Sequence, residues 1–241
     1  MGTIKLDILA IGAHPDDVEL SCSGTLIKEK SLGKKIGVLD LTRGELGSRG
    51  SADIRDREAA NAAKVMNLDV RENLGFKDGF FTNDEHHQME IVRVIRKYRP
   101  EIVLCNAIDD RHPDHAKGSN LASVSCFLSG LLRIETFLNG KKQDHWRPKH
   151  VYHYIQWKDI EPDFVVDISG FIDQKLEAVM AYESQFYKAG DEGPKTPINS
   201  ENFLQSIKYR AANLGRLTGS NYAEGFTVER YPAINSLFDL K

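Results

Sequence analysis

Apolar and polar residues along the first half of the chain alternate between two patterns, one typical of buried strands and one typical of helices. Short apolar runs rich in branched side chains end at glycine or polar residues, as buried strands do. These runs are residues 4–11, 35–41, 69–74 and 101–106. Between them lie segments with apolar residues at helical spacing, followed in two cases by Gly33 or Pro100. These segments are residues 17–32, 52–67 and 86–98.

The second half of the chain is less regular and predicts an elaborated C-terminal part. The expected elements are helices at residues 115–137, 171–182 and 200–214 and strands at residues 151–156 and 164–168. Residues 183–197 contain two glycines and two prolines and are expected to form a loop. The alternation of strands and helices predicts an α/β fold, a Rossmann-like three-layer sandwich with a mostly parallel sheet. We expect one domain over residues 1–241, because no repeat or linker interrupts the chain.

The composition predicts a globular protein whose partner is a small molecule. Apolar residues make up 41% of the 241 residues, and 32 Lys+Arg against 35 Asp+Glu give a net charge of −3. A chain without a broad basic field is not expected to bind nucleic acid or an anionic membrane surface. No apolar run approaches the roughly 20 residues needed to span a bilayer.

The cysteines and the N-terminal residues favour a cytoplasmic protein. Cys22, Cys105 and Cys126 are an odd number without the spacing of a thiolate zinc site, so we expect buried, unpaired thiols. The apolar stretch at residues 6–13 has neither a basic leader nor a cleavage site and does not resemble a signal peptide.

Imidazoles and carboxylates are concentrated in turns that follow predicted strands. The three turns are residues 13–17 (AHPDD), 42–45 (TRGE) and 110–115 (DRHPDH). Ligands of a parallel sheet bind beyond the carboxyl ends of its strands, and the fold is expected to bring these turns near each other. We therefore expect the chemistry of the protein at this edge of the sheet.

The first and third turns supply the ligands of an open zinc site, which needs three nitrogen or oxygen donors and a fourth place for water. His14 and Asp17 are three residues apart at a helix start, and His115 at the next junction completes the set. Asp16 is then free to move protons. His112 is also left over, with Asp114 near enough to fix its tautomer.

Each of these motifs, taken alone, has an interpretation that needs no metal. An Asp-Asp pair at a helix start usually caps the helix and complements its dipole, and a single His-Pro usually marks a turn. Two His-Pro-Asp tripeptides, each at a strand-to-helix junction of one α/β domain, favour the metal site.

Beyond these turns, the chain resembles the LmbE-like, or PIG-L-type, zinc-dependent N-acetylglucosamine deacetylases. The resemblance rests on AHPDD and HPDH and extends through DLTRGELGSRGSADIRDREA, NLGFKDG, VVDIS, AYESQF, KTP and YAEGF. This set covers most of the chain and is most similar to the bacillithiol-biosynthesis deacetylases, which act on N-acetylglucosaminyl-malate.

The resemblance implies a role for each matched residue. His14, Asp17 and His115 match the zinc ligands, Asp16 the general base, and His112 the residue that stabilises the oxyanion or protonates the leaving amine. Asp114 matches the partner of His112, and Arg55 matches an arginine that holds a sugar hydroxyl or the anionic part of the substrate. The resemblance also implies a homo-oligomer, trimeric or hexameric, acting on a small amino-sugar substrate.

The sequence thus predicts an amide hydrolase in which zinc and a protonated His112 hold the oxyanion while Asp16 accepts a proton from water. Whether Asp16 or His112 then protonates the amine stays open, as does zinc against another divalent metal. Alternative substrates are N-acetylglucosamine, chito-oligosaccharides or a thiol-sugar conjugate. A nucleotide-binding module is disfavoured because the first turn lacks GxGxxG, and a serine hydrolase because GxSxG is absent.

Overall fold

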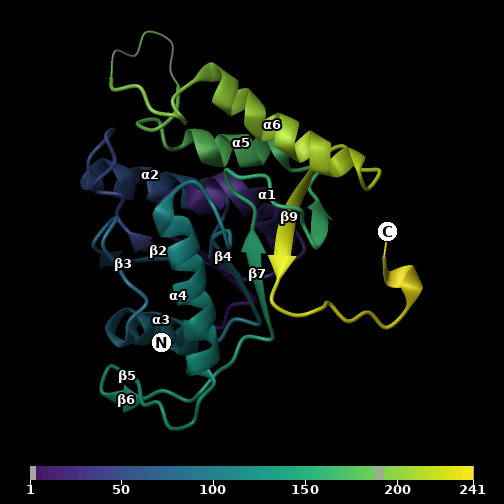
Figure 1. Cartoon of the computed structure of the whole chain (residues 1–241). Coiled ribbons are helices and arrows are strands. Elements are labelled where there is room, and N and C mark those ends of the chain that lie inside the picture. Colours follow the sequence, from purple (N-terminus) through teal and green to yellow (C-terminus); the bar gives the residue numbers. More distant parts are fainter. Residues whose placement is uncertain (1–3, 188–189, 191–192, 241) are drawn as a thin grey trace.

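The computed structural model describes residues 4–187, 190 and 193–240, and in this part of the chain seven strands form one sheet. Their order is β3-β2-β1-β4-β7-β9-β8 (Figure 1). The strands are β1 Ile8–Gly12, β2 Ile36–Thr42, β3 Val70–Phe76, β4 Ile102–Cys105, β7 His150–Tyr154, β8 Phe164–Asp167 and β9 Ala223–Val228. β3, β2, β1, β4 and β7 run parallel, whereas β9 is antiparallel to β7 and β8. The predicted mostly parallel sheet is confirmed.

Helices cover both faces of the sheet, as the sequence pattern predicts. They are α1 Asp17–Ser31, α2 Ala52–Val65, α3 Glu85–Tyr98, α4 Pro113–Ser129, α5 Ile172–Met180 and α6 Glu201–Arg216. Leu9 and Ile11 of β1 contribute to a core cluster with α3 and α4, while Ile8 and Ala10 contribute to a cluster with α1 and α5. Alternate residues of β1 thus pack against the helices on opposite faces of the sheet, which is why β1 is apolar throughout. Figure 1 shows α6 outside α5, farther from the sheet.

The helix expected at residues 115–137 is wrong at its C-terminal end. α4 ends at Ser129, and the chain then turns into a short antiparallel pair, β5 (Phe137–Leu138) with β6 (Lys141–Lys142). The cause lies on α3, where the buried guanidinium of Arg96 donates to the backbone oxygens of Ser129, Leu131 and Ile134 at 3.0, 2.9 and 2.7 Å. These bonds satisfy carbonyls that a continuing helix would have used internally.

The remaining expectations differ from the structure mainly at element ends. The sequence pattern does not predict β9, and residues 188–189 and 191–192 of the expected loop at 183–197 lie outside the described residues. The three cysteines are buried and unpaired, as expected. Among the described residues, every helix is too short or too polar to cross a bilayer.

Candidate active site

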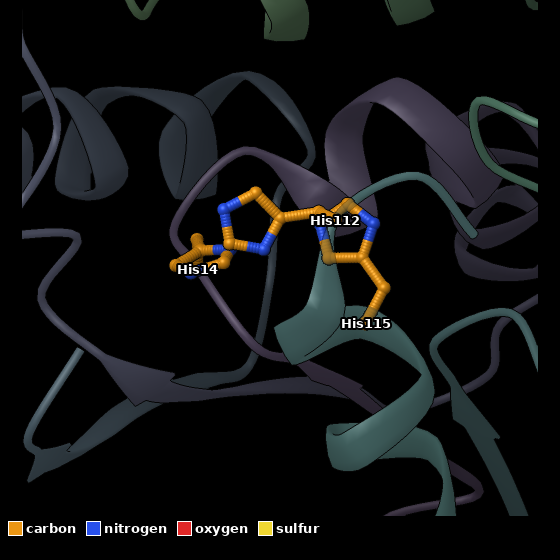
Figure 2. Close-up of side chains that lie close together, drawn as sticks. All are labelled: His14, His112 and His115. Atoms are coloured by element: carbon orange, nitrogen blue, oxygen red, sulfur yellow. The ribbon is translucent and has the colours of Figure 1, made fainter. Parts of the chain in front are cut away.

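Three histidines converge where β1 and β4 end. His14 lies in the loop after β1, and His112 and His115 lie at the start of α4 (Figure 2). Ring centroids are 4.7 Å apart for His14 and His112, 5.0 Å for His112 and His115, and 5.7 Å for His14 and His115. The two turns, about a hundred residues apart in sequence, therefore meet as the sequence predicts.

The loop that carries His14 is fixed by its neighbours in the sheet. Asn106, directly after β4, accepts a hydrogen bond from the Ala13 backbone N–H at 2.9 Å, and the Thr42 hydroxyl donates to the Ala13 carbonyl at 2.9 Å. Asp16, which precedes α1, adopts φ 116°, a left-handed conformation that is costly for a residue with a side chain. Such strain persists where the surroundings hold it, and it is concentrated at functional sites.

The Asp17 carboxylate is the centre of the cluster. It accepts hydrogen bonds from the His14 backbone N–H at 2.9 Å, from Asn106 Nδ2 at 2.9 Å and from Gln156 Nε2 at 3.1 Å. Its oxygens also lie 3.0 Å from His115 Nε2 and 3.6 Å from His14 Nδ1. Burial disfavours the charge, but His115 and His14 hold the pKa of Asp17 well below its usual range.

Two further carboxylates orient the outer histidines, and sequence reasoning gave neither a role. Asp110 Oδ2 lies 2.5 Å from His115 Nδ1, and Asp78 Oδ1 lies 3.0 Å from His14 Nε2. Carboxylates of this kind fix the tautomer and direction of metal-binding histidines. Their sequence signal was their position inside the quoted segments NLGFKDG and DRHPDH.

Asp16 points to a different partner. Its Oδ2 lies 3.2 Å from Nη2 of Arg55, a buried residue of α2 that also donates to the Pro15 carbonyl. Burial raises the pKa of Asp16 to about 6, although Arg55 opposes this shift. Asp16 thus has its side-chain contact with Arg55, while Asp17 contacts His14 and His115.

His112 differs from the expectation in its charge and in its partner. Its Nδ1 accepts the Asp114 backbone N–H at 3.3 Å, whereas the Asp114 carboxylate accepts from Gly79 N and Lys117 Nζ at 2.8 and 2.7 Å. That carboxylate lies 3.4 Å from His14 Nε2. Burial and the neighbouring imidazoles lower the pKa of His112, which favours the neutral ring. The expected carboxylate–His112 pair is therefore replaced by a backbone contact.

A cavity of about 420 Å³ opens above the cluster. Six of the seven residues predicted for the site line it: His14, Asp16, Asp17, Arg55, His112 and His115. The seventh, Asp114, is fully buried behind them. The cavity places the predicted acid, base and imidazole groups within reach of one ligand.

The residues at the cavity fit a divalent cation. Ligand atoms of a tetrahedral zinc, each about 2.0–2.2 Å from the ion, lie about 3.3 Å from one another. Asp17 Oδ1 lies 3.0 Å from His115 Nε2 and Asp17 Oδ2 lies 3.6 Å from His14 Nδ1, so each of the two pairs is close to this separation. Nitrogens of His14, His112 and His115 also lie within 4.8 Å of one another, as do donor atoms of His14, Asp78 and Asp114.

Fold and site together define a class, α/β proteins whose His and Asp side chains gather beyond the carboxyl ends of a mostly parallel sheet and could hold a metal ion. Comparison with known proteins gives the family. Residues 9–126 match the family described as PIG-L, GlcNAc-PI de-N-acetylase. The chain is 30% identical over 230 residues to the diacetylchitobiose deacetylase of Thermococcus kodakarensis, covering 90% of this chain and 81% of that protein. The chain belongs to the PIG-L family and is an N-deacetylase, a hydrolase of amide bonds.

Two further comparisons agree. The probable N-acetyl-alpha-D-glucosaminyl L-malate deacetylase 2 of Bacillus subtilis is 26% identical over 200 residues, covering 76% of this chain and 84% of that protein. The crystal structure of the conserved protein TT1542 from Thermus thermophilus superposes with a TM-score of 0.85 at 35% identity, covering 97% of this chain and 98% of that one.

Proposed function

We propose that the protein removes the acetyl group from the nitrogen of a small metabolite that contains N-acetylglucosamine. The observation that carries this proposal is the convergence of His14, Asp17 and His115 beside an independently held Asp16. Relatives whose names specify glucosamine-based amides support the substrate class.

The finer substrate is proposed to be N-acetylglucosaminyl-malate, as in bacillithiol biosynthesis. The similarity to the Bacillus subtilis malate deacetylase supports it, while the higher identity to the Thermococcus enzyme favours diacetylchitobiose as a second candidate. Arg55 lines the cavity, so its guanidinium is the candidate contact for a sugar hydroxyl or a substrate carboxylate.

His14, Asp17 and His115 would hold the metal, proposed to be Zn²⁺. When bound, this ion supplies Lewis-acid polarisation of the amide and lowers the pKa of water to about 7. Asp110 and Asp78 would orient the His115 and His14 rings for metal binding, since each carboxylate contacts one ring nitrogen and leaves the other for the ion.

Asp16 is assigned as the group that accepts a proton from the attacking water, because its carboxylate borders the cavity outside the ligand set. His112 accepts a backbone N–H at Nδ1, so its neutral ring carries the remaining proton on Nε2. That N–H can donate to the developing oxyanion without a positive charge. Asp16, which has taken a proton from the water, can then return it to the leaving amine.

The test combines metal analysis with an amine-release assay on N-acetylglucosaminyl-malate, N,N′-diacetylchitobiose and N-acetylglucosamine. We expect about one equivalent of bound metal, activity abolished by a chelator and restored by Zn²⁺, and the highest kcat/KM on the malate conjugate. Release from none of the three amides by the metal-loaded protein contradicts the proposed function. Size-exclusion chromatography with light scattering tests the trimer or hexamer, which stays a prediction.

A further inference from the structure

Besides the acidic and imidazole groups, the cavity lining includes apolar side chains of α1, α6 and the segment after β7. Six apolar side chains line this part of the cavity, which we call the inner chamber: Leu20 of α1, Ile155 after β7, and Phe203, Ile207, Ala211 and Leu214 of α6. The four α6 residues are spaced three or four apart and share one helix face. Ile155, Ile207 and Ala211 are buried, and Leu20, Phe203 and Leu214 are partly buried.

Two charged residues of the lining, Lys175 and Glu224, have no need of a polar ligand. Lys175 Nζ donates to Glu224 Oε1 at 2.6 Å and to the carbonyls of Leu20 and Glu19 at 2.8 and 3.3 Å. Glu224 in turn accepts the backbone N–H groups of α1 residues 24 and 25, at 3.0 and 2.6 Å. Since this buried ion pair is already satisfied, an apolar occupant leaves no hydrogen bond unmade.

The outer part of the cavity has a different character. There the lining includes Ser48, the backbone of Gly44 and Gly47, and the exposed Arg111. Sugar hydroxyls need hydrogen-bond partners when they leave water, so the sugar fits this outer part. The two substituents of a trans amide extend in opposite directions from its carbonyl. With the sugar outside, the acyl group is directed inward.

An acetyl group uses little of this space. Its methyl is close in size to a water molecule, whose share of liquid volume is about 30 Å³, and the whole cavity measures about 420 Å³. We propose that the inner chamber binds the hydrocarbon chain of the acyl group, so that the protein hydrolyses N-acyl amino sugars with chains longer than acetyl. This inference rests on the proposed function, because it assumes that the amide carbonyl lies at the His/Asp cluster.

The first test measures kcat/KM for glucosamine carrying N-acetyl, N-butanoyl and N-hexanoyl groups. Each methylene that enters the chamber should raise kcat/KM about fourfold, the factor that corresponds to its transfer from water. A kcat/KM that stays constant or falls with chain length overturns the inference. Hydrolysis of the N-acetyl compound in the same assay would still support the proposed function. Absence of release from all three amides contradicts the proposed function instead.

Substitutions on α6 test the location. Ala211→Leu narrows the chamber and should lower the hexanoyl-to-acetyl ratio of kcat/KM at least tenfold, whereas Leu214→Ala enlarges it and should move the preference toward longer chains. Gln205→Leu adds the same side chain on the exposed face of the helix and should leave the ratio unchanged. Thermal unfolding shows whether each variant is folded. If Ala211→Leu does not fold, Leu214→Ala alone tests the location of the acyl chain. A ratio that neither variant changes overturns the inference.

A second series of substrates tests whether the chamber binds the acyl group or the glycosidic substituent of the sugar. N-acetylglucosamine with methyl, butyl or hexyl glycosides carries the same hydrocarbon on the sugar instead of on the acyl group. We expect kcat/KM to stay nearly constant over this series. A fourfold gain per methylene here, abolished by Ala211→Leu, would assign the chamber to the glycosidic substituent and overturn the acyl assignment.

Discussion

Nη2 of Arg55 lies 3.2 Å from Oδ2 of Asp16, and both side chains are almost completely enclosed. The arginine that the sequence assigned to the substrate thus also holds the proposed general base. We predict that Arg55→Ala lowers kcat about 10²-fold on malate-linked and plain N-acetylglucosamine alike, because misplacement of a reacting group by about 1 Å costs that much. Steady-state kinetics on both substrates, with Arg55→Lys as the charge-conserving control, check this. A rise in KM confined to the malate conjugate would return Arg55 to carboxylate recognition.

Asp16→Asn removes the proton acceptor while leaving the proposed ligands in place. We expect normal metal content and a kcat reduced about 10²–10⁴-fold, the usual loss when a general base is removed. Asp173→Asn serves as the control, since that carboxylate is 92% exposed and lies outside the cavity lining. Near-normal turnover by Asp16→Asn would exclude Asp16 as the base.

His112→Ala separates the proposed oxyanion contact from metal binding. The neutral His112 ring is assigned to the substrate, so its removal should lower kcat about 10²–10³-fold, the range seen when one oxyanion donor is lost. Metal content should stay at the wild-type level, measured by elemental analysis of the dialysed protein. Loss of the metal would instead support a ligand set of His14, His112 and His115, whose nitrogens also lie close together.

The fold was predictable where the pattern of apolar residues within one segment determines whether it forms a strand or a helix. The first strands and helices follow from apolar runs and helical spacing, and α1 and α2 begin at the expected residues. β9 was missed because Glu224 near its start is a charged residue that suggests an exposed position, while in the structure it is buried against Lys175. The end of α4 was missed because Arg96, more than thirty residues earlier, binds the carbonyls that follow it. Both errors arise from contacts between distant segments.

In the site too, residues in local motifs were predictable, and residues brought together from distant segments were not. His14, Asp17 and His115 were predictable because paired His-Pro-Asp turns carry a strong local signal. Asp78, Asn106 and Gln156 each follow a different strand, and the local pattern assigns none of them to the site, although Asp78 lies inside the quoted segment NLGFKDG. Only the strand order β3-β2-β1-β4-β7 brings their loops to one edge of the sheet. The neutral state of His112 likewise depends on burial, which the sequence does not give.

Asp110 is predicted to tune metal affinity through His115, whose Nδ1 lies 2.5 Å from its carboxylate. Asp110→Asn should weaken metal binding about 10–100-fold, the typical effect of losing such a partner. Competition with a chromophoric chelator measures the affinity directly. The neighbouring Asp109→Asn is the matched control, since that carboxylate is 65% exposed and contacts Lys158 at the surface. Equal affinities of the two variants would contradict the role of Asp110.

Asp69 links the start of β2 to α1 and makes stability depend on pH. Its Oδ2 accepts the Ile36 backbone N–H at 2.8 Å and lies 2.5 Å from Lys30 Nζ. Although partial burial opposes ionisation, these bonds lower the pKa of Asp69 below its usual value. The unfolded chain therefore binds the proton more readily, so this stabilisation is present above about pH 3.9 and is lost as pH falls through the folded-state pKa.

We therefore predict that Asp69→Asn lowers the free energy of unfolding by about 1 kcal/mol at pH 7, the usual worth of such a bond. The difference between wild type and variant should shrink steadily below pH 4, because the protonated aspartate has lost the same charge. Urea unfolding at pH 7, 5 and 3 measures both free energies. Asp173→Asn should track the wild type throughout. A gap that stays constant down to pH 3 would mean that Asp69 stabilises the fold through packing and not through its charge.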